Sequence, residues 1–288
     1  MGPERDRDPR YHRYKESVMS GATTGLPVAF ISHGGGPWPW MPEELNSVYA
    51  ELASALAAII PSLPERPEAI LMVSAHWEED AFTVQSSPNP GMLYDYYGFP
   101  PHTYSVHYSS PGSPALAHRV MHVLEENGIP ARENERRGYD HGMFSPMACI
   151  RPEADIPVVQ LSLKTGLNPG DHLALGRVLR PLRKEGIFVV GSGLSYHNLR
   201  LFNRMAERPS AEFDAWLHDT VTGTRGAERN TRLENWEEAP SARTCHPREE
   251  HLIPLMVAAG CAEDEYGTVT YNQKDFMGGI HVSNFSFG

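Results

Sequence analysis

Apolar and polar positions along the chain fall into two patterns, short apolar runs and longer amphipathic stretches. The short runs are closed by small or polar residues, which is typical of buried strands followed by sharp turns. They cover residues 26–32, 68–77, 156–163 and 186–198, with a further strand candidate at 81–87 and an alternating terminal strand at 278–288.

The amphipathic stretches place apolar residues at the spacing of one helix face. They cover residues 42–63, 113–128, 171–186, 210–224 and 246–260. In the second of these, Ser113 can cap the helix, Pro114 suits its first turn and Gly128 suits its exit.

Strand and helix patterns alternate along most of the chain. This order predicts an α/β fold, a single domain with a central mixed, largely parallel sheet flanked by helices. No linker or internal repeat divides residues 26–288, so we expect one catalytic domain there. Residues 1–25 are charged and carry no apolar core, so we expect a flexible N-terminal tail and no secretory signal.

Charge and cysteine content narrow the class of protein. The formal net charge is -11, from 25 basic and 36 acidic residues, which argues against a nucleic-acid binder and against docking on an anionic membrane. No apolar run approaches the roughly 20 residues of a membrane span. The three cysteines form no CxxC pair, and such sparse use suits a reducing cytoplasm. We therefore expect a cytoplasmic protein.

Three of the apolar runs end in the same way, as FISHGGG, VSAHW and VGSGLSYHN. Each delivers a histidine just past the carboxyl end of its strand: His33, His76 and His197. Ligand sites of open α/β sheets lie at the carboxyl ends of the strands, and neutral imidazole is a common metal ligand. The repeated pattern therefore predicts a metal centre.

A fourth ligand can come from the segment REEHLIPL. His251 opens an apolar helical stretch there and could point inward from a helix start. Glu249 and Glu250 compete with it, because two histidines and one carboxylate form a common iron site. The local sequence leaves this choice open.

A further histidine, His141, lies in GYDHGMFSP, where the Asp, Gly and Pro residues indicate a tight loop. From such a loop it could reach a cleft as an acid or a base, and Asp140 could orient a neighbouring group or serve the turn. The segment 80–114 is long and rich in Pro, Tyr and Gly, which favours a functional loop over the site.

The residues around HGGG exclude two other classes of site, a P-loop and an esterase site. HGGG suggests a phosphate or oxyanion loop, but no GK[ST] follows it, so a P-loop is excluded. The HGGG motif of esterases requires a GxSxG elbow, and the sequence contains none.

A set of ordered motifs resembles a known family. The motifs are HGGGPW, SAHW, YYGFPPHTYSVHY, PGSPALA, YDHGMFSP, DIPVVQLS, SGLSYHNLR and PREEHLIPL. In this order they resemble the class III extradiol ring-cleavage dioxygenases, and most of all the DOPA 4,5-dioxygenase-like branch of the LigB superfamily. The resemblance spans roughly residues 27–285.

The resemblance implies a mononuclear non-haem metal, one per chain, Fe(II) in active dioxygenases and often Zn(II) in isolated samples. By position it implies that His33, His76 and His251 are the metal ligands, which favours His251 over the two glutamates. It implies that His197 is a further ligand or the base beside the metal, and that His141 is a second acid–base residue.

One departure affects the substrate. The first motif of this branch commonly reads HGSP, whereas this chain has HGGGPW with Trp38 and Trp40. His33 keeps its place in the motif, but we expect a changed pocket wall. The resemblance therefore does not identify the substrate.

The expected activity is extradiol ring opening of a catechol-type aromatic with O2, because two adjacent hydroxyls can chelate one metal. His197 would serve as the base and His141 as the acid. Four residues could supply an aromatic wall for the ring: Tyr96, Tyr97, Phe99 and Tyr104. The alternatives are a zinc-dependent hydrolase on the same scaffold and a non-catalytic relative that binds a partner. A homo-oligomer is left open.

Overall fold

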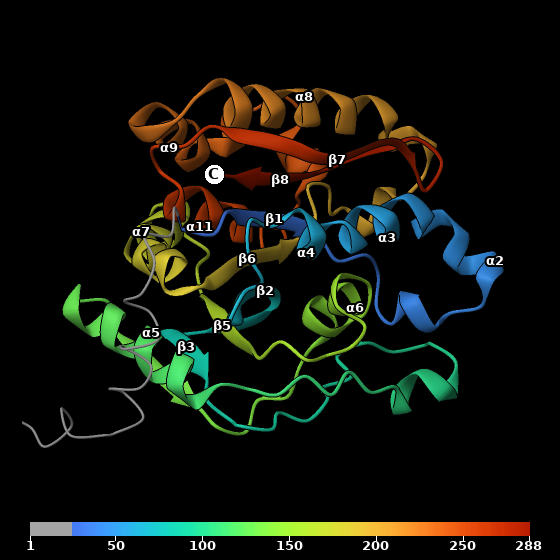
Figure 1. Ribbon diagram of the computed structural model, residues 1–288. Coiled ribbons are helices and arrows are strands. Elements are labelled where there is room, and N and C mark those ends of the chain that lie inside the picture. The colour runs from blue at the N-terminus through green and yellow to red at the C-terminus, as the bar shows by residue number, and fades with distance from the viewer. Residues whose placement is uncertain (1–24) are drawn as a thin grey trace, which may run out of the picture.

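The computed structural model describes residues 25–288, in which eight strands form one mixed sheet (Figure 1). The strand order is β4-β3-β5-β2-β6-β1-β8-β7. The strands are β1 (Val28–Ser32), β2 (Ala69–Glu79), β3 (Phe82–Gln85), β4 (Ala131–Asn134), β5 (Val158–Lys164), β6 (Ile187–Gly193), β7 (Gly267–Phe276) and β8 (Ile280–Phe287). The predicted tail lies, apart from Gly25, outside the described residues.

Four neighbouring strands, β5, β2, β6 and β1, run parallel through the middle of the sheet. Antiparallel pairing joins β8 to β1 and to β7 at one side, and β3 to β5 at the other. Strands β1 and β6 are buried along their whole length, as strands covered on both faces are. The predicted α/β domain with a mixed, largely parallel sheet is confirmed.

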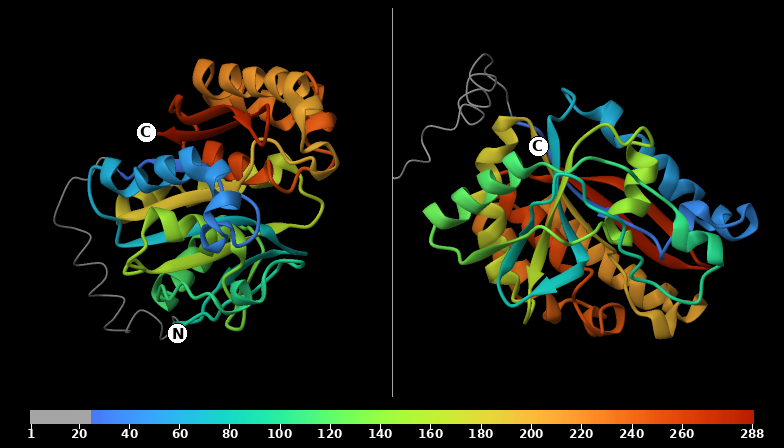
Figure 2. Two further views of the ribbon diagram at one scale, coloured as in Figure 1. Left: turned by 90° about the vertical axis from the view of Figure 1, so that its right-hand side faces the viewer. Right: turned by 90° about the horizontal axis from the view of Figure 1, so that it is seen from below.

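Helices cover both faces of this twisted sheet (Figure 2). They are α2 (Glu43–Asn46), α3 (Ala50–Ala57), α4 (Ile59–Ser62), α5 (Pro114–Glu126), α6 (His141–Ile150), α7 (Pro169–Leu179), α8 (Glu207–Gly223), α9 (Gly226–Glu234), α10 (Ala242–Cys245) and α11 (Ile253–Cys261). Helix α11 packs on β6 and β1, and α8 packs on β7 and β8, while α6 packs on β2 and α3 on α6. Within residues 25–288, no helix has the length and apolar character of a membrane span.

Most predicted elements are present. The Ser113 side chain accepts a hydrogen bond from the Leu116 N–H at the start of α5, as the sequence indicated. The predicted helix at 42–63 is divided by a 3-10 turn at Ser47–Tyr49, however, and strands β4 and β7 were not predicted. β7 is an edge strand with register shifts, so its polar and apolar positions do not alternate regularly.

The loop predicted around His141 is wrong, because His141 is the first residue of helix α6. Pro146 suggested a loop, since proline removes the N–H that would donate to the carbonyl of the residue four positions before it. In this helix that carbonyl belongs to Gly142, and the Ser192 hydroxyl of β6 donates to it instead. A side chain of the sheet thus replaces the missing backbone donor.

The predicted helix at 246–260 also begins later than expected. Helix α11 starts at Ile253, with Pro254 in its first turn, so His251 lies in the turn before the helix. Proline is favoured in the first turn because its missing N–H would have no partner there. Pro254 is therefore the sequence signal that indicates where helix α11 begins.

Candidate active site

The site lies where β1 and β6 end beside the middle of β2. His33 follows β1 directly, and its N–H donates to the carbonyl of Gly193, the last residue of β6, at 3.1 Å. His76 lies within β2 and not past its end, because β2 continues along β5 after its pairing with β6 stops at Ser74. The parallel order of the strands brings the two imidazoles together.

Two glycines of β6 allow the turn before α11 to lie against the sheet. A Cβ on Gly191 would lie 2.3 Å from the Pro254 carbonyl oxygen, and one on Gly193 would lie 2.1 Å from the His251 carbonyl oxygen. The Leu194 N–H donates to that same His251 oxygen at 3.0 Å. Only glycine permits such a close approach of two backbones, and this approach directs His251 to the strand ends.

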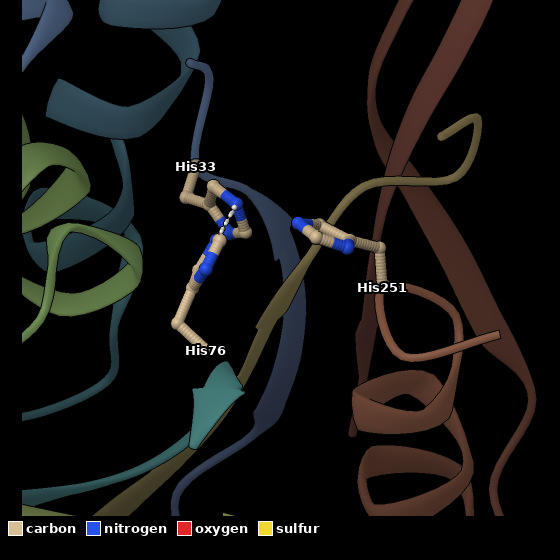
Figure 3. Close-up of side chains that lie close together, drawn as sticks. All are labelled: His33, His76 and His251. Atoms are coloured by element: carbon tan, nitrogen blue, oxygen red, sulfur yellow. Dashed lines mark hydrogen bonds between the residues drawn. The ribbon is translucent and has the colours of Figure 1, made fainter. Parts of the chain in front are cut away.

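The imidazoles of His33, His76 and His251 point toward one another (Figure 3). Their ring centroids are 4.8, 5.0 and 4.9 Å apart. Each ring offers one nitrogen within 4.8 Å of the others, and the Nε2 atoms of His33 and His76 are 3.0 Å apart. We call these three residues the histidine triad.

The triad fits a divalent metal ion. Two nitrogens that each bind a metal ion at about 2.1 Å lie about 3.0 Å apart in an octahedral site and about 3.4 Å apart in a tetrahedral one, and the His33 and His76 Nε2 atoms are 3.0 Å apart. Burial and the neighbouring imidazoles lower the pKa of His33 and of His251 well below the ordinary value. Burial, together with His141, lowers the pKa of His76 to about 3. All three rings are therefore neutral at pH 7, the form that binds metals.

His141 and His197 complete a cluster of five imidazoles. The His141 ring centroid lies 3.9 Å from that of His76 and 5.5 Å from that of His33. The His197 ring stacks on His251 at a centroid distance of 3.4 Å and an interplanar angle of 20°. All five histidines singled out from the sequence thus lie in one place.

Two carboxylates flank the cluster, Asp95 from the long loop and Glu250 from the turn before α11. Burial by itself raises the pKa of Asp95, but the hydrogen bond from His141 and the nearby imidazoles bring it below the ordinary value. Burial likewise raises the pKa of Glu250, and the hydrogen bond from His197 lowers it overall. Glu249 points elsewhere, since its carboxylate pairs with Arg243.

Asp140, the residue before His141, holds the segment behind His76. It is fully buried and accepts hydrogen bonds from Ser74 at 2.8 Å, from Gln160 at 2.8 Å and from Arg137 at 3.0 Å. Arg137 in turn donates to the His76 carbonyl oxygen at 3.0 Å. The expected orienting contact of Asp140 is therefore made with Ser74 and Arg137.

Aromatic side chains lie beside the cluster. The Tyr96 ring is 5.9 Å from that of His141 and 5.3 Å from that of Phe99, and Tyr104 lies 5.3 Å from Tyr96. Tyr97 is 91% exposed and contributes no ring contact to this group. Three of the four aromatic residues expected at the site thus lie together.

The two tryptophans of HGGGPW differ in their surroundings. Trp38 is buried, stacks on Tyr49 at 4.8 Å and donates from Nε1 to the His33 carbonyl oxygen at 2.6 Å. Trp40 is partly exposed and lies 5.8 Å from Phe144. Trp38 therefore supports the backbone of His33 from the core, and Trp40 alone extends the aromatic group.

The sequence did not reveal Asp95, Ser192 or Arg137. Asp95 accepts from both the backbone N–H and the ring of His141, and Ser192 contacts Nδ1 of His33 at 3.2 Å. Their only sequence signals were the long loop at 80–114 and the strand-end pattern of β6. Neither signal indicates which polar residue faces the histidines.

The sheet and the cluster define an α/β enzyme scaffold with a histidine site able to bind a metal ion at the carboxyl ends of its strands. The chain belongs to the LigB family: residues 27–283 match the catalytic LigB subunit of aromatic ring-opening dioxygenase. It is an aromatic ring-opening dioxygenase of the DOPA-dioxygenase-like branch, as the motifs indicated.

Named relatives place it in that branch. Dioxygenase tasH of Hapsidospora irregularis is 39% identical over 91% of this chain and 85% of the relative. The 4,5-DOPA dioxygenase extradiol of Beta vulgaris is 38% identical over 75% of this chain and 81% of its own, and that of Escherichia coli K12 is 33% identical over 95% and 98%. The crystal structure of an uncharacterized protein from Escherichia coli K12 superposes with a TM-score of 0.74 at 29% identity, covering 91% of this chain and all of its own.

Proposed function

We propose that the chain opens the ring of a catechol-type aromatic beside its two hydroxyls, using O2 and one divalent metal ion held by the histidine triad. The observation that carries the proposal is the convergence of five imidazoles from separate segments, with three tyrosine and phenylalanine rings beside them. Two of these imidazoles lie outside the triad, which is what proton transfer beside a metal requires.

The metal that suits this reaction is Fe(II). When bound, Fe(II) would acidify the catechol hydroxyls and exchange electrons with O2, whereas Zn(II) has no redox chemistry. Zn(II) still fits three nitrogen ligands, so it is the natural inactive probe of the same site.

His197 is our candidate for the base, and it is also the candidate for a fourth ligand. Its Nδ1 lies 3.0 Å from Glu250 Oε1, so its Nε2 is the nitrogen left to accept a proton from a hydroxyl. The stacking of His197 on His251 keeps that nitrogen beside the triad.

His141 is our candidate for the acid. Its Nδ1 lies 2.9 Å from Asp95 Oδ1, and its ring contacts both His76 and Tyr96. The His141 ring thus lies between the triad and the aromatic group, where, once its Nε2 has taken up a proton in addition to the one on Nδ1, it can transfer that Nε2 proton to the opening ring.

The substrate class is a DOPA-like or otherwise substituted catechol. A flat ring suits the aromatic group formed by Tyr96, Phe99 and Tyr104, and relatives carry the name 4,5-DOPA dioxygenase extradiol. Trp40 lies against Phe144 at the edge of that group, where the sequence departs from HGSP. We therefore expect the ring substituent, and not the diol, to distinguish this enzyme from those relatives.

The test is reconstitution of the metal-free chain with Fe(II) under anaerobic conditions, followed by addition of O2 and a panel of catechols. We expect a yellow ring-fission product and incorporation of labelled oxygen from O2. The Zn(II)-loaded protein is the matched control and should form no product.

A fully Fe(II)-loaded protein that turns over no catechol would contradict the proposal. Product formation without O2 would instead indicate the zinc-dependent hydrolase, and tight partner binding without turnover would indicate a non-catalytic relative.

We also propose that the protein is cytoplasmic. Cys149, Cys245 and Cys261 are free thiols, and free thiols suit a reducing compartment. The measurement is the thiol titre of freshly extracted protein, which should equal three per chain.

A further inference from the structure

Each of the two carboxylates beside the cluster lies between two imidazoles. Asp95 has its Oδ1 at 2.9 Å from His141 Nδ1 and its Oδ2 at 3.4 Å from His76 Nδ1. In each contact the imidazole presents Nδ1 and not Nε2. Asp95 thus joins one member of the histidine triad to one histidine outside it.

Glu250 repeats this arrangement on the other side. Its Oε1 lies 2.9 Å from His251 Nδ1 and 3.0 Å from His197 Nδ1. Again one triad histidine and one outside histidine share a carboxylate, and again both present Nδ1.

These contacts determine where the imidazole protons lie. An ionised carboxylate only accepts hydrogen bonds, and a neutral imidazole carries one N–H. A ring whose Nδ1 faces a carboxylate therefore carries its proton on Nδ1 and leaves a lone pair on Nε2. The two carboxylates together assign this tautomer to four rings.

Ser192 assigns the same tautomer to the fifth ring. Its hydroxyl proton is donated to the Gly142 carbonyl, so its oxygen accepts from His33 Nδ1 at 3.2 Å. The His33 and His76 Nε2 atoms then face each other at 3.0 Å with a lone pair on each. Two lone pairs at this distance repel unless a cation or a proton lies between them.

We propose that Asp95 and Glu250 are positioning residues, each of which holds one metal-binding histidine and one acid–base histidine in the Nδ1-protonated tautomer. The inference rests on the proposed metal site and reaction. It makes the metal ligands and the proton-transfer groups dependent on shared carboxylates: Asp95 serves His76 and His141, and Glu250 serves His251 and His197.

A purely structural role for Asp95 has to be distinguished from this one. Its Oδ1 also accepts the His141 backbone N–H at 3.0 Å, at the first turn of α6, so its loss would also remove a helix-cap contact. Stability alone therefore cannot test the proposal, whereas the position of the ring protons can.

The experiment is long-range nitrogen–proton NMR of the metal-free protein labelled with 15N at histidine, with signals assigned by single histidine replacements. We expect the Nδ1–H tautomer for His76, His141, His197 and His251. In Asp95→Asn one arm of the side chain becomes an N–H donor, so one of its two imidazoles should change to the Nε2–H tautomer. Both contacts of Glu250 are made by the same oxygen, Oε1, so Glu250→Leu is the variant that removes this acceptor, and it should allow His251 or His197 to change to the Nε2–H tautomer.

Zn(II) affinity provides a second readout, measured by competition with a chelator. Each variant should bind Zn(II) about 10–100-fold more weakly, as expected for the loss of a carboxylate behind a metal-binding histidine. Glu250→Asp keeps the charge and should recover part of the affinity. The controls are Asp80→Asn and Glu237→Gln, which remove exposed carboxylates paired with Arg132 and Arg243, and these should change neither readout.

The wild-type spectrum alone can overturn the proposal, whether or not a variant folds. Nε2–H tautomers at His76 and His141, or at His251 and His197, would contradict it, and so would tautomers unchanged in well-folded variants. The spectrum needs no metal or substrate. A protein that shows the expected tautomers but has no ring-opening activity would therefore refute the proposed function and leave this inference standing. Ring opening together with the wrong tautomers would refute this inference alone.

Discussion

Gly193 lies directly against the backbone of His251, so close that a Cβ on Gly193 would be 2.1 Å from the His251 carbonyl oxygen. The last residue of β6 therefore sets the position of a triad histidine that follows it by more than fifty residues in the sequence. Since the contact is with backbone, no side-chain rotation can relieve it.

Replacement of Gly193 by alanine should consequently displace His251. We expect Gly193→Ala to lower the free energy of unfolding by about 1–3 kcal/mol, the usual cost of overpacking, and to weaken Zn(II) binding. Gly91→Ala is the control, because a Cβ there meets nothing within 4 Å. Chelator competition and urea unfolding measure the two effects, and unchanged Zn(II) affinity in Gly193→Ala would show that the contact does not position His251.

Replacement of a triad histidine and replacement of an acid–base histidine should have different effects on metal content and turnover. His33→Ala should lose the metal, because His33 Nε2 lies 3.0 Å from His76 Nε2 at the centre of the triad. His141→Ala should keep the metal and lower turnover by roughly 10²–10⁴-fold, the usual contribution of a general acid. Metal analysis and steady-state turnover of the Fe(II) form check both. A full equivalent of tightly bound metal in His33→Ala would make the triad assignment wrong.

Ser192 and Pro146 should be energetically coupled through the Gly142 carbonyl. Ser192→Ala removes the hydroxyl that donates to this carbonyl, and we expect a loss of about 1–3 kcal/mol in the free energy of unfolding. Pro146→Ala supplies a backbone N–H four residues after Gly142, which can take over as donor. In that background Ser192→Ala should cost less, by about 0.5–2 kcal/mol. Urea unfolding of the four proteins measures the coupling, and strictly additive losses would rule it out.

The stability of the domain should fall below pH 6.5 because of His172, which lies away from the site. This ring is fully buried; its Nδ1 donates to the Asn168 carbonyl at 2.7 Å and its Nε2 accepts the Lys164 N–H at 3.1 Å. Burial lowers the pKa of His172 to about 4. The unfolded chain, with a pKa of about 6.5, therefore takes up the proton first as the pH falls.

The stabilisation from neutral His172 is fully present above pH 6.5 and is lost as the pH falls from 6.5 toward 4. At pH 5.5 the loss from this one residue is about 1.4 kcal/mol. Urea unfolding at pH 7.5 and 5.5 should show that His172→Gln loses about that much less than the wild type. His118→Gln replaces an exposed histidine of α5, so it should behave like the wild type, and equal losses in all three proteins would contradict the assignment.

Six of the eight strands, and His33, His76 and His197, were predictable because short apolar runs and the residues that follow them are local signals. The ordered motifs of the resemblance then brought in His141 and His251. Sheet order is less local, but parallel strands place their carboxyl ends together, and this was enough to bring His33 and His76 to one place. The helix at His141 was missed because its stabilising partner, Ser192, lies on a distant strand. Asp95 was missed for the same reason, since a carboxylate in an irregular loop carries no periodic pattern.

The histidine triad is assembled from both ends of the described chain. His33 leaves the first strand, while His251 precedes the last helix and the final strand pair β7 and β8, and β8 joins the sheet beside β1. During synthesis the ribosome therefore releases His33 and His76 long before their third partner, and a nascent chain that ends before residue 251 lacks one member of the triad. A metal ion that needs all three imidazoles would therefore bind only after His251 has been synthesised and the sheet has formed, and it would stabilise that folded form alone.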